Sequence, residues 1–230
     1  MNDPMESSRR IPVSIIVGGL IIALALYVSM GGHFFPASKP HSSISFIRAV
    51  GAADHMFGNP VAPIVIVEYA DFDCDYCKGF FDTLHSIVAN TGTKGEVAWV
   101  YREFPLTELH PNALAHARAS ECAGQVAGNT IFWDFAGLLY ANQPVDPSTY
   151  GALAERAGVP GDAFLACYTD AAAQVGARIE ADRRNALDIG APGTPFAVIL
   201  VQGKVSAVID GAYSYDAVKQ LVDQARTEIR

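Results

Sequence analysis

The sequence is poor in charge, above all in basic residues, and it holds only four cysteines among its 230 residues. Lys and Arg number 16 against 24 Asp and Glu, a net charge of −8, and no basic block is available for a nucleic-acid-binding surface. Four cysteines are too few for a miniprotein built on disulfides. The 13 prolines and 20 glycines follow no period, which excludes collagen-like and low-complexity chains. Half of the residues are apolar, so a sizeable core is available and wholesale disorder is excluded.

Charged residues are absent from residue 11 to residue 32, and Arg9 and Arg10 directly precede this apolar stretch. About twenty helical residues span the roughly 30 Å of bilayer hydrocarbon. The positive-inside rule then keeps residues 1–10 in the cytoplasm. We expect a transmembrane anchor over 11–32 in the inner membrane, with the folded domain in the periplasm or another extracytoplasmic space. A cleaved signal peptide is the alternative, because Ala23-Leu24-Ala25 resembles a cleavage site.

Beyond the apolar stretch the sequence pattern changes again. Residues 33–56 carry Gly, Pro, Ser and His without sustained periodicity, which predicts a linker with at most a short helix near 44–50. From residue 57 to residue 230, β-branched runs and helical patterns predict an α/β domain. It has strands at 64–69, 96–104, 196–201 and 205–209, a helical insert over about 107–190, and a final amphipathic helix.

Cys74 and Cys77 form a C-x-x-C motif where the first predicted strand gives way to a helix. At such a junction the leading cysteine lies at the helix N-terminus, where unpaired N–H groups and the helix dipole stabilise a thiolate. The second cysteine lies one turn further on and can attack a mixed disulfide. The motif therefore predicts a redox-active pair. We expect no metal, because a zinc site needs two more ligands at comparable spacing and Cys122 and Cys167 are isolated.

Three segments together resemble the DsbA-like thiol-disulfide oxidoreductases of the thioredoxin superfamily: GNPVAPIVIVEYADFDCDYC, YREFPL and GAPGTPF. The resemblance covers about residues 57–230. It implies a thioredoxin fold interrupted by a helical domain, with Cys74 as the nucleophile, Cys77 as the resolving thiol and no cofactor. It also implies a cis peptide bond before Pro195, with Thr194 presenting its backbone to a substrate strand. On spacing alone, Pro195 fits an ordinary proline at the entry to a strand equally well.

Glu68 lies six residues before Cys74, in a predicted strand that is otherwise apolar. In the family that the chain resembles, an acidic residue at this position lies buried beneath the active-site pair. There it takes part in proton transfer to the resolving thiol. An exposed Glu at a sheet edge is the alternative.

The dipeptide between the two cysteines departs from the family pattern. Related enzymes often carry Pro after the first cysteine, and the most oxidising carry His before the second, whereas this chain has Asp75 and Tyr76. The charge of Asp75 opposes a thiolate at Cys74, and Asp71 and Asp73 add to that effect. We therefore expect this dipeptide to tune the pair towards a Cys74 pKa above that of the strongest oxidants and a lower redox potential.

Cys122 and Cys167 fall in the predicted helical insert, 45 positions apart. In an oxidising compartment two buried thiols within reach would pair, and the family that the chain resembles includes members with a second disulfide in the helical domain. We expect a structural disulfide; two separate buried thiols are the alternative. His110 and His116 lack the spacing of metal ligands, and we predict no functional role for them.

These features favour a thiol oxidase that forms disulfides in exported proteins. Its partners would be those reduced proteins and a membrane redox partner that re-oxidises or reduces the C-x-x-C pair. We expect a monomer that meets the membrane through its N-terminal helix and binds no nucleic acid. A disulfide isomerase or reductase is the first alternative, which the acidic motif favours. A non-catalytic, thiol-based metallochaperone is the second, although Gly193-Thr194-Pro195 argues against it.

Overall fold

The computed structural model describes residues 42–91, 95–170 and 172–229. The predicted cytoplasmic segment 1–10, the apolar stretch 11–32 and the first part of the predicted linker lie outside these residues, so the transmembrane anchor stays a prediction. None of the helices in the described ranges is long and apolar enough to cross a membrane.

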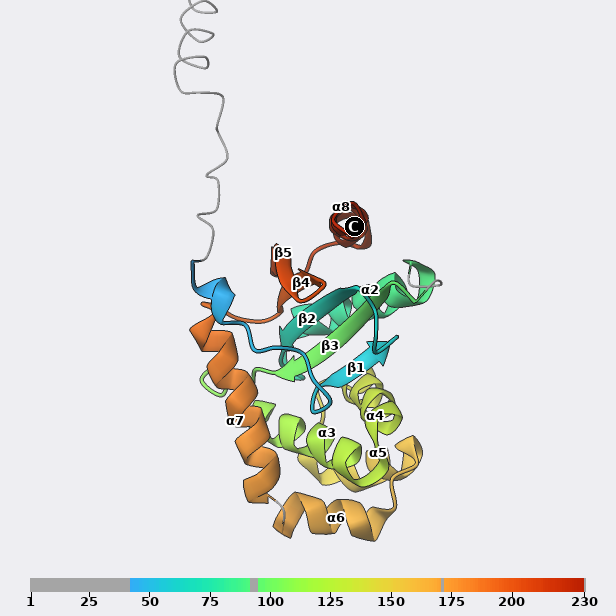
Figure 1. The fold of residues 1–230 in the computed structure, drawn as a ribbon. Helices are drawn as coiled ribbons and strands as arrows, with labels where there is room; N and C mark the ends of the chain where they lie inside the picture. The colour runs from blue at the N-terminus through green and yellow to red at the C-terminus, as the bar shows by residue number, and fades with distance from the viewer. Residues whose placement is uncertain (1–41, 92–94, 171, 230) are drawn as a thin grey trace, which may run out of the picture. The chain divides into compact units, whose positions relative to one another are not determined.

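A five-stranded mixed sheet forms the centre of the domain (Figure 1). The strands lie in the order β1-β3-β2-β4-β5; β2 and β3 run parallel, and the other neighbouring pairs are antiparallel. Side chains of β2, β3 and β4 are almost all buried, because both faces of these strands are covered, and they therefore appear in the sequence as continuous apolar runs. The predicted α/β architecture is confirmed. The strand bounds are β1 (His55–Gly58), β2 (Ile64–Ala70), β3 (Val97–Glu103), β4 (Phe196–Val201) and β5 (Lys204–Asp210).

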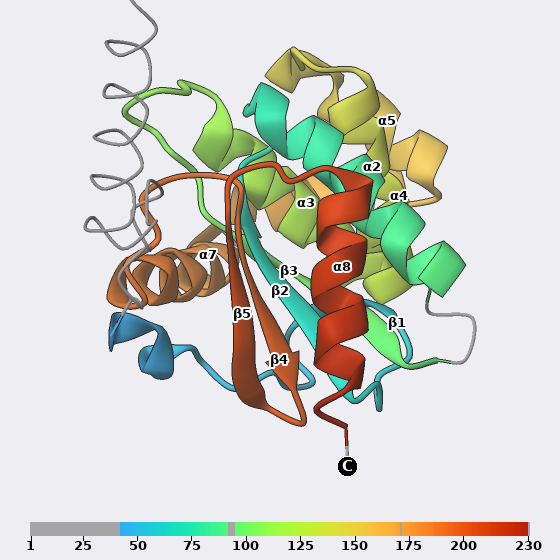
Figure 2. The same ribbon diagram turned by 90° about the horizontal axis from the view of Figure 1, so that it is seen from above.

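Helices cover both faces of the sheet (Figure 2). Alternate residues of a strand point to opposite faces. Ile66 and Trp99 belong to the core beneath α2 and α8, and Val67 and Val100 belong to the core beneath the C-terminal end of α7. The bounds are α2 (Asp75–Thr91), α7 (Ala172–Asp188) and α8 (Tyr215–Arg226).

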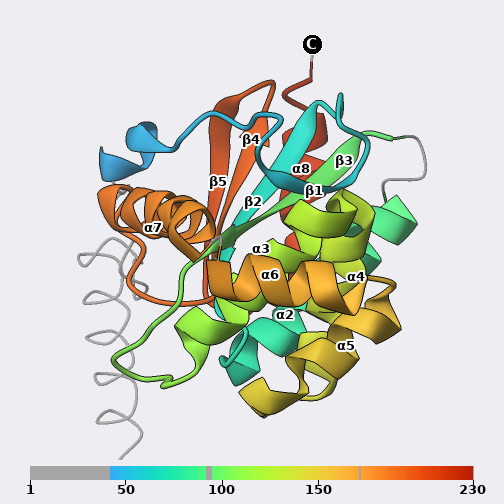
Figure 3. The ribbon, with the colours of Figure 1, turned by 90° about the horizontal axis from the view of Figure 1, so that it is seen from below.

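The helical insert separates β3 from β4 in the sequence. Its α4 contacts β1, the edge strand of the sheet, and its α6 lies beside α3 (Figure 3). Gly158 ends α5 with a left-handed φ of 89°, a conformation that glycine adopts without a steric penalty. The bounds are α3 (Ala113–Ala127), α4 (Asn129–Ala141), the 3-10 helix η2 (Pro147–Thr149), α5 (Tyr150–Ala157) and α6 (Gly161–Asp170), followed by α7.

The linker predicted over 33–56 ends earlier than the sequence indicates, and the predicted domain boundary at residue 57 is too late. A 3-10 helix, η1 (Ser42–Phe46), contacts α7, and β1 pairs with β3 through His55 opposite Tyr101. Between them, Asp54 accepts a hydrogen bond from the fully buried Arg102, 2.9 Å from its Nε. This segment is therefore part of the domain, because it supplies the counter-charge for a buried guanidinium.

Candidate active site

Cys74 lies at the N-terminus of α2, directly after the loop that follows β2. Its backbone N–H donates to the carbonyl oxygen of Asp71, and its own carbonyl accepts hydrogen bonds from the N–H groups of Cys77 and Lys78. This first helical turn places both thiols on the same side of the helix. Both cysteines are free and buried: Cys74 is 6% exposed and Cys77 is fully buried.

The surroundings of Cys74 favour its thiolate. A hydrogen bond from the Cys77 thiol lowers the pKa of Cys74 to about 6, against the opposing effect of burial. Thr194 and the backbone N–H groups of Cys77 and Tyr76 at the helix start contribute to this lowering of the Cys74 pKa. Cys74 can therefore serve as a nucleophile or a leaving group near neutral pH.

Cys77 has the opposite character. Burial raises the pKa of Cys77 well above its ordinary value, and its hydrogen bond to Cys74 and the charges of Cys74 and Glu68 raise it further. At neutral pH this thiol keeps its proton. The two sulfurs of the motif are thus chemically unequal, because the thiolate is favoured at Cys74 and the thiol at Cys77.

Glu68 is fully buried in β2, and it interacts electrostatically with both Cys74 and Cys77. Trp99 donates a hydrogen bond from Nε1 to its Oε2 over 2.9 Å, whereas its Oε1 has no hydrogen-bond partner among the described residues. Burial raises the pKa of Glu68 to about 8, and the charge of Cys74 also raises it. The carboxyl group can therefore hold a proton near Cys77 at neutral pH.

Thr194 and Pro195 face the cysteines from the segment that leads into β4. The peptide bond between them is cis. The Cys74 thiol lies 3.5 Å from the Thr194 carbonyl oxygen, to which it donates. Gly211, after β5, donates to the Pro195 carbonyl over 3.1 Å, which holds the segment against the sheet. A backbone carbonyl is therefore presented directly beside the nucleophile.

Asp75 and Tyr76 point away from the core. Both are exposed, with Tyr76 74% exposed, and Asp75 is the first residue of α2. The groups that shift the Cys74 pKa most are Cys77, burial and Thr194. The tuning roles of Asp75 and Tyr76 stay predictions.

Two residues that the sequence analysis set aside, His110 and His116, bind the loop before Cys74. His110 Nδ1 lies 2.8 Å from Asp71 Oδ2, and His116 Nε2 lies 3.0 Å from Asp73 Oδ1. Both histidines belong to the start of the helical insert. The sequence carries no local pattern that predicts these contacts, because the partners meet only through the fold.

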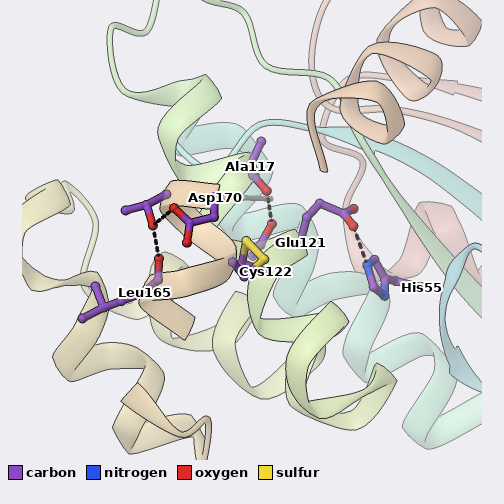
Figure 4. The surroundings of a disulfide bond; sticks show 9 residues. His55, Ala117, Glu121, Cys122, Leu165 and Asp170 are labelled. Atoms are coloured by element: carbon purple, nitrogen blue, oxygen red, sulfur yellow. Dashed lines mark hydrogen bonds and ion pairs between the residues drawn. A yellow bond between two sulfur atoms is a disulfide. The ribbon is translucent and has the colours of Figure 1, made fainter. Parts of the chain in front are cut away.

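Cys122 and Cys167 form a disulfide with an S–S distance of 2.06 Å, which joins α3 to α6 (Figure 4). Beside this disulfide, Glu121 Oε2 lies 3.2 Å from His55 Nε2. The same carboxylate forms an ion pair with Arg178. No group of three or more His, Cys, Asp or Glu within the described ranges is arranged to hold a metal ion.

Comparison with known sequences identifies one family and a set of antiporters. The family model described as Thioredoxin matches residues 51–224. A Na⁺/H⁺ antiporter, NhaA 1 of Salinispora arenicola, is 31% identical over 173 residues, which are 75% of this chain and 24% of the relative. NhaA 3 of Salinispora tropica is 31% identical over 77% of this chain and 25% of the relative. The chain spans about a quarter of the length of these curated relatives.

Solved structures similar to this one include a protein described as a thiol-disulfide exchange protein. The α-DsbA2 protein of Wolbachia pipientis superposes with a TM-score of 0.69 at 19% identity, over 80% of this chain and 95% of that one. Oxidised BdbD of Bacillus subtilis superposes with a TM-score of 0.66 at 21% identity, over 77% of this chain and 95% of that one. The family match shows that the chain belongs to the thioredoxin family, and the two solved structures show that its fold is similar to theirs.

Proposed function

We propose that this protein is a thiol-disulfide oxidoreductase that forms disulfide bonds in exported proteins through Cys74 and Cys77. The observation that carries the proposal is the chemical inequality of the two sulfurs. The pKa of Cys74 is lowered to about 6, whereas that of Cys77 is raised. A pair of this kind releases Cys74 readily from a mixed disulfide, so it transfers its disulfide to a substrate.

The reaction starts from the oxidised protein, in which Cys74 and Cys77 share a disulfide. A substrate thiolate attacks Cys74 Sγ, forming a mixed disulfide while the bond to Cys77 breaks. Cys77 receives the electron pair and then a proton, for which the buried carboxyl of Glu68 is the source. A second substrate thiolate attacks its own sulfur in the mixed disulfide, and Cys74 leaves as the stabilised thiolate. The substrate loses two electrons, which the protein gains as the Cys74 thiolate and the Cys77 thiol. The two substrate thiols give their protons to solvent as they form the attacking thiolates, and a proton from solvent restores Glu68.

The Thr194–Pro195 segment supports substrate binding in this scheme. Its carbonyl beside Cys74 can accept a hydrogen bond from an extended substrate chain, which would align the substrate sulfur with Cys74. Exposed Tyr76 lies in the same turn of α2 and offers apolar surface next to the nucleophile.

Location and partners are part of the proposal. An anchor over 11–32 would hold the domain at the outer face of the inner membrane, where reduced exported proteins arrive. A membrane redox partner would then accept the two electrons and restore the disulfide. Cation antiport is not part of the proposal, because the matched segment is about a quarter of the antiporters' length.

The proposal is tested by oxidation of a reduced, unfolded model protein such as reduced ribonuclease. Wild type in its oxidised form should accelerate disulfide formation, and Cys74→Ser should abolish the effect. Cys77→Ser should accumulate mixed disulfides through Cys74, visible by non-reducing electrophoresis and mass spectrometry. Mixed disulfides that form through Cys77 in Cys74→Ser, and not through Cys74, would reverse the assignment. Reduction of the model protein's disulfides without oxidation would favour a reductase.

A further inference from the structure

Asp71 is a buried carboxylate in direct contact with the active-site loop. It is 1% exposed, and its carbonyl oxygen accepts the N–H of Cys74. Its Oδ1 accepts the N–H of Asp73 over 2.8 Å, and its Oδ2 accepts the N–H of Leu106 over 2.8 Å. A buried negative charge at this position opposes a second negative charge on the nearby Cys74 sulfur.

His110 is the ionisable side chain that meets this carboxylate. Its Nδ1 lies 2.8 Å from Asp71 Oδ2, and its side chain is 26% exposed, so it can exchange a proton with solvent. Burial alone would lower the pKa of His110, but the hydrogen bond and charge of Asp71, followed by the charges of Cys74 and Asp73, raise it. The imidazolium is thus favoured where it faces three acidic groups.

We propose that His110 is a positioning residue for the redox reaction, whose positive charge neutralises Asp71 and so stabilises the Cys74 thiolate from outside the C-x-x-C motif. This inference rests on the proposed function. It also explains how Cys74 can stay a good leaving group in a loop that carries two aspartates.

The second aspartate of the loop is held in a parallel arrangement. His116 Nε2 lies 3.0 Å from Asp73 Oδ1, and the other ring nitrogen of His116 contacts the Tyr150 hydroxyl. His116 is fully buried and contacts a partner on each side of its ring, so it holds the loop in place, and His110 is partly exposed. The start of the helical insert therefore acts on the active site through His110.

The sign of the pH effect follows from this arrangement. Below the raised pKa of His110 the imidazolium offsets Asp71, and the thiolate is stabilised. As the pH rises through that pKa, the proton leaves, the charge of Asp71 acts on Cys74 without an imidazolium beside it, and the thiolate loses stability. Linkage is reciprocal. If the charge of His110 lowers the pKa of Cys74 by a given amount, the Cys74 thiolate must raise the pKa of His110 by that amount.

The test compares His110→Gln with His85→Gln in the reduced protein, by thiolate absorbance titration and by equilibrium with glutathione. His85 is exposed on α2, and its ring contact is with Phe57. We expect His110→Gln to raise the Cys74 pKa by roughly half a unit to one unit and to lower the redox potential, and His85→Gln to change neither. An unchanged Cys74 pKa in folded His110→Gln would overturn the inference, even where the wild type oxidises its substrates. A wild type without oxidase activity would count against the proposed function instead.

Two further measurements separate charge from structure. His110→Lys keeps a positive charge opposite Asp71, so its Cys74 pKa should stay closer to wild type than that of His110→Gln. Equal increases in both variants would overturn the inference, because then the charge is not the cause. By NMR titration, the pKa of His110 should be higher in the reduced protein than in the oxidised one. Equal values in the two redox states would also overturn it.

Discussion

At the scale of single residues, the function depends on groups that hold or release one proton. Cys74 and Cys77 lie on one helical turn, yet a donated hydrogen bond lowers the pKa of the first, and burial raises that of the second. Glu68 completes the set, because burial in β2 raises its pKa to about 8. Each group is therefore held in the protonation state that dithiol exchange at neutral pH requires.

Glu68 should make stability depend on pH. The native state keeps its proton up to about pH 8, whereas the unfolded chain releases it near 4.5. Between these values the native state binds more protons, so the contribution of Glu68 to stability falls as the pH rises. We expect Glu68→Gln, which can still accept the hydrogen bond from Trp99, to gain stability over wild type progressively from pH 5 to pH 8. Denaturant unfolding of the oxidised proteins measures this difference.

The control for this experiment is Glu108→Gln, because Glu108 is exposed. Its stability difference from wild type should stay flat over the same range. A flat difference for Glu68→Gln as well would show that Glu68 ionises normally in the folded protein, and its role as a proton donor to Cys77 would be lost.

The residues of the site differ in how far the sequence can predict them. Cys74 and Cys77 form a local motif, and the burial of Glu68 follows from the apolar strand around it. The contacts of His110 and His116 could not be predicted, because their aspartate partners lie 39 and 43 positions away in the chain. Two residues so far apart in the chain form no recognisable sequence pattern. Only the packing of the insert against the loop brings each histidine to its aspartate.

At the level of helices and strands, a disulfide joins two helices of the insert to each other. Separate hydrogen bonds join the insert to the active-site loop. The disulfide between Cys122 and Cys167 joins α3 to α6, and α3 carries His116, which contacts Asp73. The disulfide thus stabilises the helices of the insert, whereas the histidine–aspartate contacts connect the insert to the loop that carries Cys74.

Removal of the disulfide should affect stability more than redox chemistry. A bridge that closes 45 residues contributes about 4 kcal/mol in the chain-entropy model. The double variant Cys122→Ala with Cys167→Ala should therefore unfold with a free energy lower by about that amount, while the Cys74 pKa stays at its wild-type value. Urea unfolding and thiolate titration measure the two quantities. A changed Cys74 pKa would mean that the disulfide acts on the active site through α3.

The sequence pattern does not predict β1, an edge strand of the sheet. It has only four residues, HMFG, and it forms by pairing with the edge of β3 that β2 leaves free, rather than through its own composition. The longer runs of β2, β3 and β4 were predictable because burial on both faces requires continuous apolar sequence. Short edge strands carry no such constraint.

At the scale of the whole molecule, residues 42–54 belong to the folded domain. Arg102 is fully buried; it donates to Asp54, to the Tyr69 hydroxyl and to the carbonyl oxygen of Arg48. Arg48 in turn forms an ion pair with Asp182 of α7 over 2.6 Å. This network ties the N-terminal segment to the sheet and to the insert.

A chain that begins at residue 55 should therefore be less stable than one that begins at residue 42. The shorter chain leaves the Arg102 guanidinium buried without its carboxylate, and removing one partner of a buried pair costs about 3–5 kcal/mol. Thermal and urea unfolding of the two chains measure the loss. Adding Arg102→Leu to the shorter chain should restore part of it. Equal stability of the two chains would show that residues 42–54 do not stabilise the domain.

The redox potential of the Cys74–Cys77 pair, measured by equilibrium with glutathione, decides whether the pair acts as an oxidant. The Cys74 pKa of about 6 lies between the values of about 7 for thioredoxin and about 3.5 for DsbA. The potential should accordingly fall between about −270 mV and about −120 mV, the values of those two proteins. A potential in this range means that the reduced form is stabilised and that the pair can donate its disulfide to reduced proteins. A potential at or below about −270 mV would contradict the account, because the pair would then act as a reductant.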